Sequence, residues 1–201
     1  MLTIISNNFL ANFVKNIEKM ELYNGQPAEL DGRSEAERNV YALLNKLGIP
    51  YSTLCHEAAF TMEECAKVEK TLGAPICKNL FLCNRQQTQF YLVMLPADKV
   101  FKTKEITSQL GCARLSFASE NNMVELLHIH PGAVSPMGLM NDSRKKVLLV
   151  IDKDLFDNDL FGCHPCVNTA SLKLSINDLT QVFMPAIEHE YRVVELKGEE
   201  D

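Results

Sequence analysis

CKNLFLC (residues 77–83) and QFYLVML (residues 89–95) are two apolar runs on either side of the polar stretch NRQQT at 84–88. Apolar runs of this length with a polar connection are typical of a β-hairpin. Because nearly every position in both runs is apolar, we expect two central strands that are covered on both faces of their sheet. The hairpin is therefore the expected centre of the fold.

Lys78 is the charged residue within the first run. A lysine in a buried strand either extends its ammonium group to the edge of the sheet or directs it into a cleft. Asn79 points to the opposite face in a regular strand, so at most one of these two side chains faces a site unless the strand bends.

Helical and extended patterns continue on both sides of the hairpin. The pairs Ser34 with Glu37 and Thr61 with Glu64 have the spacing of a capping box, which marks the start of a helix. The expected helices are 34–47, 61–72, 103–110, 119–128 and one that starts at Ser175, and the further strands are 50–55, 113–117, 169–174 and 191–196.

A second hairpin is expected from residues 137–140 and 146–152, around NDSR at 141–144. PGAVSP at 131–136 is expected to be a rigid loop, since proline and glycine disfavour regular pairing. Strand pairs mixed with helices, without a repeated βαβα rhythm, predict an α/β or α+β domain, with a mixed β-sheet surrounded by helices.

The first 33 residues are expected to be an N-terminal helical extension. Apolar residues recur at helical spacing near 8–21, which predicts an amphipathic helix. NGQPAELDG at 24–32 is rich in turn residues and is the expected joint. The compact domain is then expected to cover residues 34–198, with the extension docked on it or on a partner.

The composition excludes several classes of protein. Hydrophobic residues make up 46% of the chain and charged residues 23%, which is typical of a globular protein. The net charge of −6 argues against non-specific coating of nucleic acid, although 99–104 and 144–146 are local basic clusters. No apolar run is long enough for a membrane span, and MLTIIS has no basic residues before its apolar run, so we expect a cytoplasmic protein without a signal peptide.

The seven cysteines are expected to be reduced thiols, because their number is odd and a disulfide framework is typical of secreted proteins. CHPC at 163–166 has the spacing of a redox pair, but such a pair acts at the start of a helix and this one leads into a strand. A zinc site would need two more ligands, for which His128 and His130 are available. The redox pair and the zinc site both stay open as minor hypotheses, and we expect neither a metal nor a cofactor.

Other common catalytic patterns are absent: the sequence has no G-x-S-x-G, no phosphate-binding loop and no G-x-G-x-x-G. The loop from Gly132 to Pro136 can present backbone N–H groups to a ligand with little steric hindrance. An ordinary surface turn is the simpler reading of that loop from spacing alone.

Five segments, in this order and spacing, nevertheless resemble one family. They are APICKNLFL at 74–82, RLSFAS at 114–119, PGAVSPMGL at 131–139, VIDK at 150–153 and CHPCVNTA at 163–170. Together they are similar to the YbaK/prolyl-tRNA-synthetase-associated editing domain family, and within it to freestanding prolyl-tRNA editing proteins that deacylate alanyl-tRNA(Pro). The resemblance covers residues 34–196 and leaves the extension outside it.

The resemblance implies a fold and a set of site residues. It implies a mixed sheet wrapped by helices, with Lys78 as the essential pocket lysine and His164 as the site histidine. The implied substrate-binding residues are Asn79, Asn168 and the G-x-x-x-P loop, which consists of Gly132, Ala133, Val134, Ser135 and Pro136. Cys163 and Cys166 depart from the family pattern around His164.

The function implied by the resemblance is trans-editing, the hydrolysis of the ester in mischarged tRNA(Pro), with alanyl-tRNA(Pro) as the expected substrate. Such an editing site must exclude proline by size, and Val134 or Met137 could form the excluding wall. Prolyl-tRNA synthetase or other translation components are possible partners. The alternatives are a deacylase for cysteinyl-tRNA(Pro) or another aminoacyl-tRNA, and a non-catalytic module that senses an amino acid or a charged tRNA.

Overall fold

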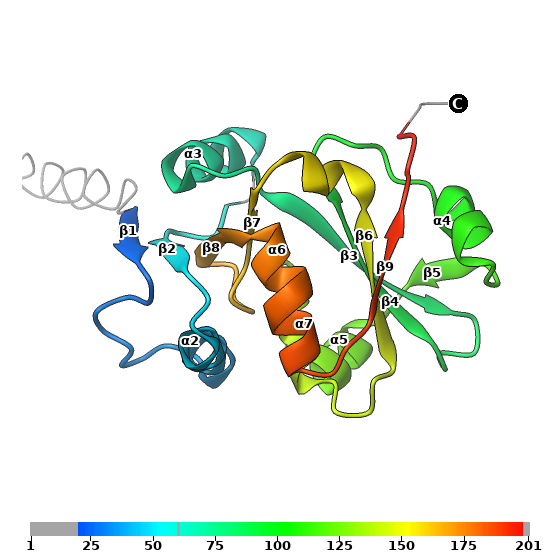
Figure 1. The fold of residues 1–201 in the computed structure, drawn as a ribbon, viewed down its shortest axis with the longest axis horizontal. Helices are drawn as coiled ribbons and strands as arrows, with labels where there is room; N and C mark the ends of the chain where they lie inside the picture. The colour runs from blue at the N-terminus through cyan, green and yellow to red at the C-terminus, as the bar shows by residue number, and fades with distance from the viewer. Residues whose placement is uncertain (1–19, 60, 199–201) are drawn as a thin grey trace, which may run out of the picture.

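The computed structural model describes residues 20–59 and 61–198, and these form two β-sheets with helices around them (Figure 1). The four-stranded sheet has the order β1 (Glu21–Asn24), β2 (Tyr51–Cys55), β8 (Ala170–Ser175) and β7 (Leu160–Cys163). The five-stranded sheet has the order β5 (Leu115–Phe117), β3 (Cys77–Asn84), β4 (Phe90–Pro96), β6 (Val147–Asp152) and β9 (Tyr191–Val194).

Helices connect the strands. The longer ones are α2 (Glu35–Leu47), α3 (Met62–Leu72), α4 (Thr103–Leu110) and α5 (Glu120–Leu127). The shorter ones are η1 (Pro136–Asn141), η2 (Lys153–Asp157), and the consecutive turns α6 (Ile176–Asp178), η3 (Leu179–Phe183) and α7 (Met184–Ala186). No helix within 20–59 or 61–198 has the length and apolar character that a membrane span needs.

The predicted central hairpin is confirmed. β3 and β4 pair antiparallel in the interior of the five-stranded sheet, with Cys77 opposite Pro96 and Cys83 opposite Phe90. β4 and β6 pair in parallel, as do β6 and β9, so the sheet is mixed. The predicted fold class, a mixed α+β architecture, is therefore confirmed as well.

The predicted second hairpin is wrong, because residues 137–140 belong to the helical turn η1 and β6 pairs only with parallel neighbours. Pro136 starts this turn with a fixed φ and without an N–H group, and the Ser135 side chain caps it by accepting from the N–H of Met137. Gly138 packs so closely that an added Cβ would lie 2.4 Å from Ile129 Cδ1.

Two strands were not predicted. β7 contains Gly162, which lowers strand propensity, and its Cβ position would lie 2.9 Å from the side chain of Ile76. β1 lies within the predicted extension and pairs antiparallel with β2, so residues 21–24 are part of the four-stranded sheet. The predicted amphipathic helix near 8–21 falls almost entirely outside the described residues.

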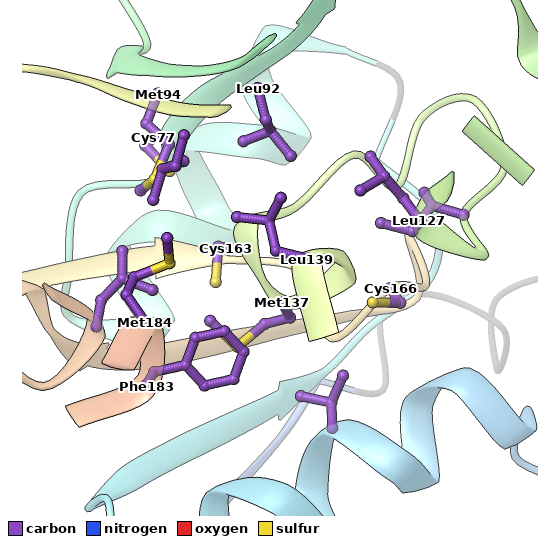
Figure 2. Packing of buried hydrophobic residues seen from close by; sticks show 14 of the residues in the cluster. Cys77, Leu92, Met94, Leu127, Met137, Leu139, Cys163, Cys166, Phe183 and Met184 are labelled. Atoms are coloured by element: carbon purple, nitrogen blue, oxygen red, sulfur yellow. The ribbon is translucent and has the colours of Figure 1, made fainter. Parts of the chain in front are cut away.

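The core lies on both faces of the five-stranded sheet, and β3 divides its side chains between them. Cys77, Phe81 and Cys83 belong to the large cluster between the two sheets, part of which Figure 2 shows. Leu80 and Leu82 belong to the smaller cluster on the other face, beneath α4. This alternation decides to which side each polar residue of β3 points.

Candidate functional site

His164 follows the last residue of β7, and its ring is fixed by the start of β8. Its Nδ1 lies 2.8 Å from the carbonyl oxygen of Ala170. Because a carbonyl only accepts, Nδ1 carries the proton, and Nε2 of the neutral ring is left as an acceptor. Burial lowers the pKa of His164, and the hydrogen bond to Ala170 opposes this only in part. Near pH 7 the ring is therefore neutral and has one lone pair available.

The loop between α5 and η1 begins with a tight turn. The N–H of Ala133 donates to the carbonyl of His130 at 3.2 Å, with Pro131 and Gly132 at the two central positions. Gly132 has a φ of 86°, which an L side chain rarely adopts, and the arrangement matches a type II turn. A Cβ at Gly132 would also lie 3.7 Å from the side-chain nitrogen of Asn168, so this asparagine lies against the loop.

The turn leaves backbone donors unused. Within 20–59 and 61–198, no hydrogen bond engages the N–H groups of Gly132, Val134 or Ser135. Gly132 and Val134 are reached by solvent, whereas Ser135 is fully buried and the N–H of Ala133 is used within the turn. That the loop supplies donors to a substrate stays a prediction. Unused N–H groups on a fixed turn are suited to binding an anionic oxygen.

Ser135 fastens this loop to the histidine. Its side chain is fully buried, and its hydroxyl donates to the carbonyl oxygen of His164 while it accepts from the N–H of Met137 at 3.2 Å. Pro136 and Met137 are buried in the core. Val134 packs against the same core but stays partly exposed, so Val134 and not Met137 can contact a substrate directly.

Asn79 shares a face of β3 with Cys77, whose thiol donates to the carbonyl of Gly162 at 3.2 Å. Asn79 therefore faces β7, the strand that ends just before His164. The structure brings together the loop, Asn168 and His164, with Asn79 on the side of β3 that faces them.

Lys78 is not part of this group. It lies opposite Leu95, on the face of β3 that also carries Leu80 and Leu82, and its Nζ donates to the carbonyl oxygen of Lys99 at 2.9 Å. The expected contact between Lys78 and the loop is absent in this arrangement of the side chain. Its catalytic role stays a prediction.

The two basic clusters differ in availability. Lys99 Nζ contacts Asp152 at 2.7 Å, Asp154 at 2.6 Å and the carbonyl of Leu196 at 2.7 Å, so this side chain has no capacity left for RNA. The residues of 144–146 are exposed, and Lys145 and Lys146 border a cavity of about 930 Å³ that Arg192 also lines. Lys145 Nζ donates to the carbonyl of Ile187, and this bond lies at the surface.

His56 was not singled out from the sequence, although it lies beside the site. It follows β2, is 7% exposed, and its ring centroid is 6.4 Å from that of His164. Its Nδ1 lies 2.7 Å from the carbonyl of Glu57 and its Nε2 lies 2.9 Å from the hydroxyl of Ser171. The pairing of β2 with β8 creates this arrangement, and a single sequence does not reveal it.

Cys77, Cys163 and Cys166 are buried, uncharged thiols. Burial raises the pKa of Cys77 and Cys166 to about 12 and raises that of Cys163 as well. A redox cysteine needs an accessible thiolate, so the CHPC motif lacks that chemistry here. In the part of the chain that the structure describes, no group of three or more His, Cys, Asp or Glu residues is placed to hold a metal ion.

The chain is similar to known proteins. Residues 56–182 match a family model described as the aminoacyl-tRNA editing domain, a range that contains all of the site residues above. The chain is 35% identical over 162 residues to the prolyl-tRNA editing protein ProX of Acetoanaerobium sticklandii, covering 81% of this chain and 98% of that protein. It is 30% identical over 164 residues to the prolyl-tRNA synthetase associated domain-containing protein 1 of Danio rerio, covering 81% and 86%.

A solved structure shares the fold. The crystal structure of a candidate trans-editing enzyme for prolyl tRNA synthetase superposes with a TM-score of 0.61 at 17% identity, over 81% of this chain and 98% of that one. The family model covers more than half of the chain, and the relative from A. sticklandii is matched along nearly its whole length. This chain therefore belongs to the aminoacyl-tRNA editing domain family.

Proposed function

We propose that this protein is a trans-editing deacylase that hydrolyses the ester between an amino acid and the terminal ribose of mischarged tRNA(Pro), with alanyl-tRNA(Pro) as its preferred substrate. The observation that carries the proposal is the attachment of a donor-bearing loop to a neutral histidine through the buried hydroxyl of Ser135. Membership of an editing family and the similarity to a prolyl-tRNA editing protein support the same substrate class.

The reaction needs water to attack the ester carbonyl, and the bond from that carbon to the ribose oxygen to break. The unused N–H groups of Gly132 and Val134, which lie on residues that solvent reaches, stabilise the oxyanion that develops, and Nε2 of His164 accepts a hydrogen bond from the attacking water. The neighbouring ribose hydroxyl relays the proton that the attacking water loses to the leaving ribose oxygen. The products are the free amino acid and tRNA with its hydroxyl restored, and no protein nucleophile is required.

Lys78 supplies a positive charge to the 3′ end of the tRNA in this proposal. Its only hydrogen bond among the described residues is to an uncharged carbonyl, and no carboxylate in that part of the chain neutralises it. Lys78 is the second residue of β3, so its flexible stem can turn around the end of the strand when a phosphate or an ester carbonyl is present.

Val134 is the proposed wall that excludes proline. A site that must reject a slightly larger apolar substrate does so by steric exclusion, because one methylene group changes binding by only about 1–3 kcal/mol. The partly exposed side chain of Val134 is next to the donors that bind the ester. The exposed cluster 144–146 is the proposed contact for the tRNA backbone.

The test is a deacylation panel with alanyl-, cysteinyl- and prolyl-tRNA(Pro). We expect the wild type to release alanine fastest and to leave prolyl-tRNA intact, and we expect His164→Ala to lower the rate at least about 100-fold. Fast release of cysteine with slow release of alanine would move the assignment to cysteinyl-tRNA(Pro). Binding of charged tRNA without any hydrolysis would indicate a sensing module instead.

A further inference from the structure

We infer that His56 is a positioning residue, which holds His164 in the form that carries its proton on Nδ1 and keeps Nε2 unprotonated. The inference rests on the proposed function for its kinetic consequence, but the positioning itself is a property of the folded protein. It starts from the contacts that His56 makes on either side of Ala170.

His56 binds both neighbours of Ala170. Its backbone N–H donates to the carbonyl of Thr169 at 3.0 Å, and its Nε2 lies 2.9 Å from the hydroxyl of Ser171. Ala170 lies between these two residues, and its carbonyl oxygen is the acceptor for Nδ1 of His164. The position of the atom that selects the tautomer of His164 is therefore fixed from both sides by one residue.

The ring of His56 has a defined state of its own. Its Nδ1 donates to the carbonyl of Glu57, which leaves Nε2 as the acceptor for the hydroxyl of Ser171. Ser171 is 1% exposed, so its hydroxyl has no access to water as an alternative partner. Loss of the His56 ring would leave this hydroxyl unpaired and would allow the first residues of β8 to shift.

Two substitutions separate positioning from simple packing. His56→Ala removes the ring, whereas His56→Gln retains an amide oxygen that can accept from Ser171. His189→Gln is the matched control, because His189 is also 7% exposed but hydrogen bonds to the carbonyl of Asp142, outside the site. Ser171→Ala removes the hydrogen bond from the other side and replaces His56→Ala if that variant fails to fold.

The first measurement is the tautomer of His164, from long-range ¹H–¹⁵N correlation spectra of protein with labelled histidine. The chain has five histidines, so the His164 signals can be assigned by comparison with His164→Gln. We expect a single form with the proton on Nδ1 in the wild type and in His189→Gln, a mixture in His56→Ala and Ser171→Ala, and the wild-type form in His56→Gln.

The second measurement is the kinetics of deacylation. We expect His56→Ala to lower kcat about tenfold with KM within about twofold, as is typical when the partner that orients a site residue is lost, and His56→Gln to recover most of the rate. A lower rate with an unchanged tautomer of His164, or an unchanged rate and tautomer, overturns the inference. If the wild type hydrolyses no aminoacyl-tRNA, the proposed function fails, and the spectra alone decide the role of His56.

Discussion

Lys78 and Lys99 are joined by one hydrogen bond, yet their ammonium groups are in opposite situations. Lys99 binds two carboxylates and a carbonyl, and the carboxylate of Asp152 is itself fully buried. Among residues 20–59 and 61–198, Lys78 binds only the carbonyl of Lys99. A lysine whose donors are all used stabilises the fold, whereas one that keeps both its charge and unused donors can bind a ligand. The same substitution at both positions tests this difference.

Lys99→Met should have the largest effect on stability. It would leave the buried carboxylate of Asp152 without its partner, and breaking a buried pair in this way costs about 3–5 kcal/mol. Unfolding in urea measures the loss. Lys153→Met is the control, because its pair with Glu195 is exposed, and water and salt screen such pairs so that they contribute little to stability. A similar small loss for both variants would show that the Lys99 cluster does not stabilise the fold.

Lys78→Met should have little effect on stability and a large effect on activity. We expect its free energy of unfolding to stay within about 1 kcal/mol of the wild type, because only a hydrogen bond to a carbonyl is lost. Deacylation of alanyl-tRNA(Pro) should fall at least about 100-fold, as expected when a charge that stabilises the transition state is removed. Full activity in Lys78→Met would reject the proposed role and would agree with the orientation that the side chain has here.

Ser135→Ala tests the link between the loop and His164. The variant loses the bond to the His164 carbonyl and the cap on η1, so we expect a loss of about 1–3 kcal/mol in stability and about tenfold in kcat. Ser143→Ala is the control, since Ser143 is exposed in the turn before β6. Stability loss with an unchanged kcat per folded molecule would show that the loop does not depend on this link for its function.

Local sequence signals predicted much of this molecule. The central hairpin followed from two apolar runs, and the expected capping box is present at Thr61. At Ser34 only the serine side chain caps the helix, because the Glu37 carboxylate binds Arg33 and Tyr41 instead. The errors arose where tertiary contacts override local pattern. Residues 137–140 look like a strand, but Pro136 and the close packing of Gly138 make them a helical turn.

The candidate site was predictable only in part, because short motifs identify some of its residues whereas tertiary contacts connect them. His164 and the loop could be identified from short motifs, which the resemblance to a family places in one site. Their connection through Ser135, and the approach of His56, depend on residues 29 and 115 positions apart in the chain. The face of β3 to which Lys78 points depends on the register with β4, which periodicity alone does not fix.

The smallest expected effect is the dependence of the free energy of unfolding on pH. Burial lowers the pKa of His56, His164 and His189, so all three are neutral in the folded protein near pH 7. The unfolded chain binds protons at these positions near pH 6.5, as free histidine does. These histidines should therefore leave the free energy of unfolding unchanged above about pH 7. The free energy should fall as the pH drops through 6.5, by at most about 1.4 kcal/mol per pH unit for each histidine.

Urea unfolding at pH 7.5, 6.5 and 5.5 measures this slope. His189→Gln should reduce the slope by the contribution of one proton, because burial lowers the pKa of His189. The proximity of His56 to His164 makes simultaneous protonation of both unfavourable in the folded protein, so the two together should contribute at least as much to the slope as two isolated buried histidines. A free energy of unfolding that stays constant from pH 7.5 to 5.5 would contradict the lowering of the pKa of His164 by burial.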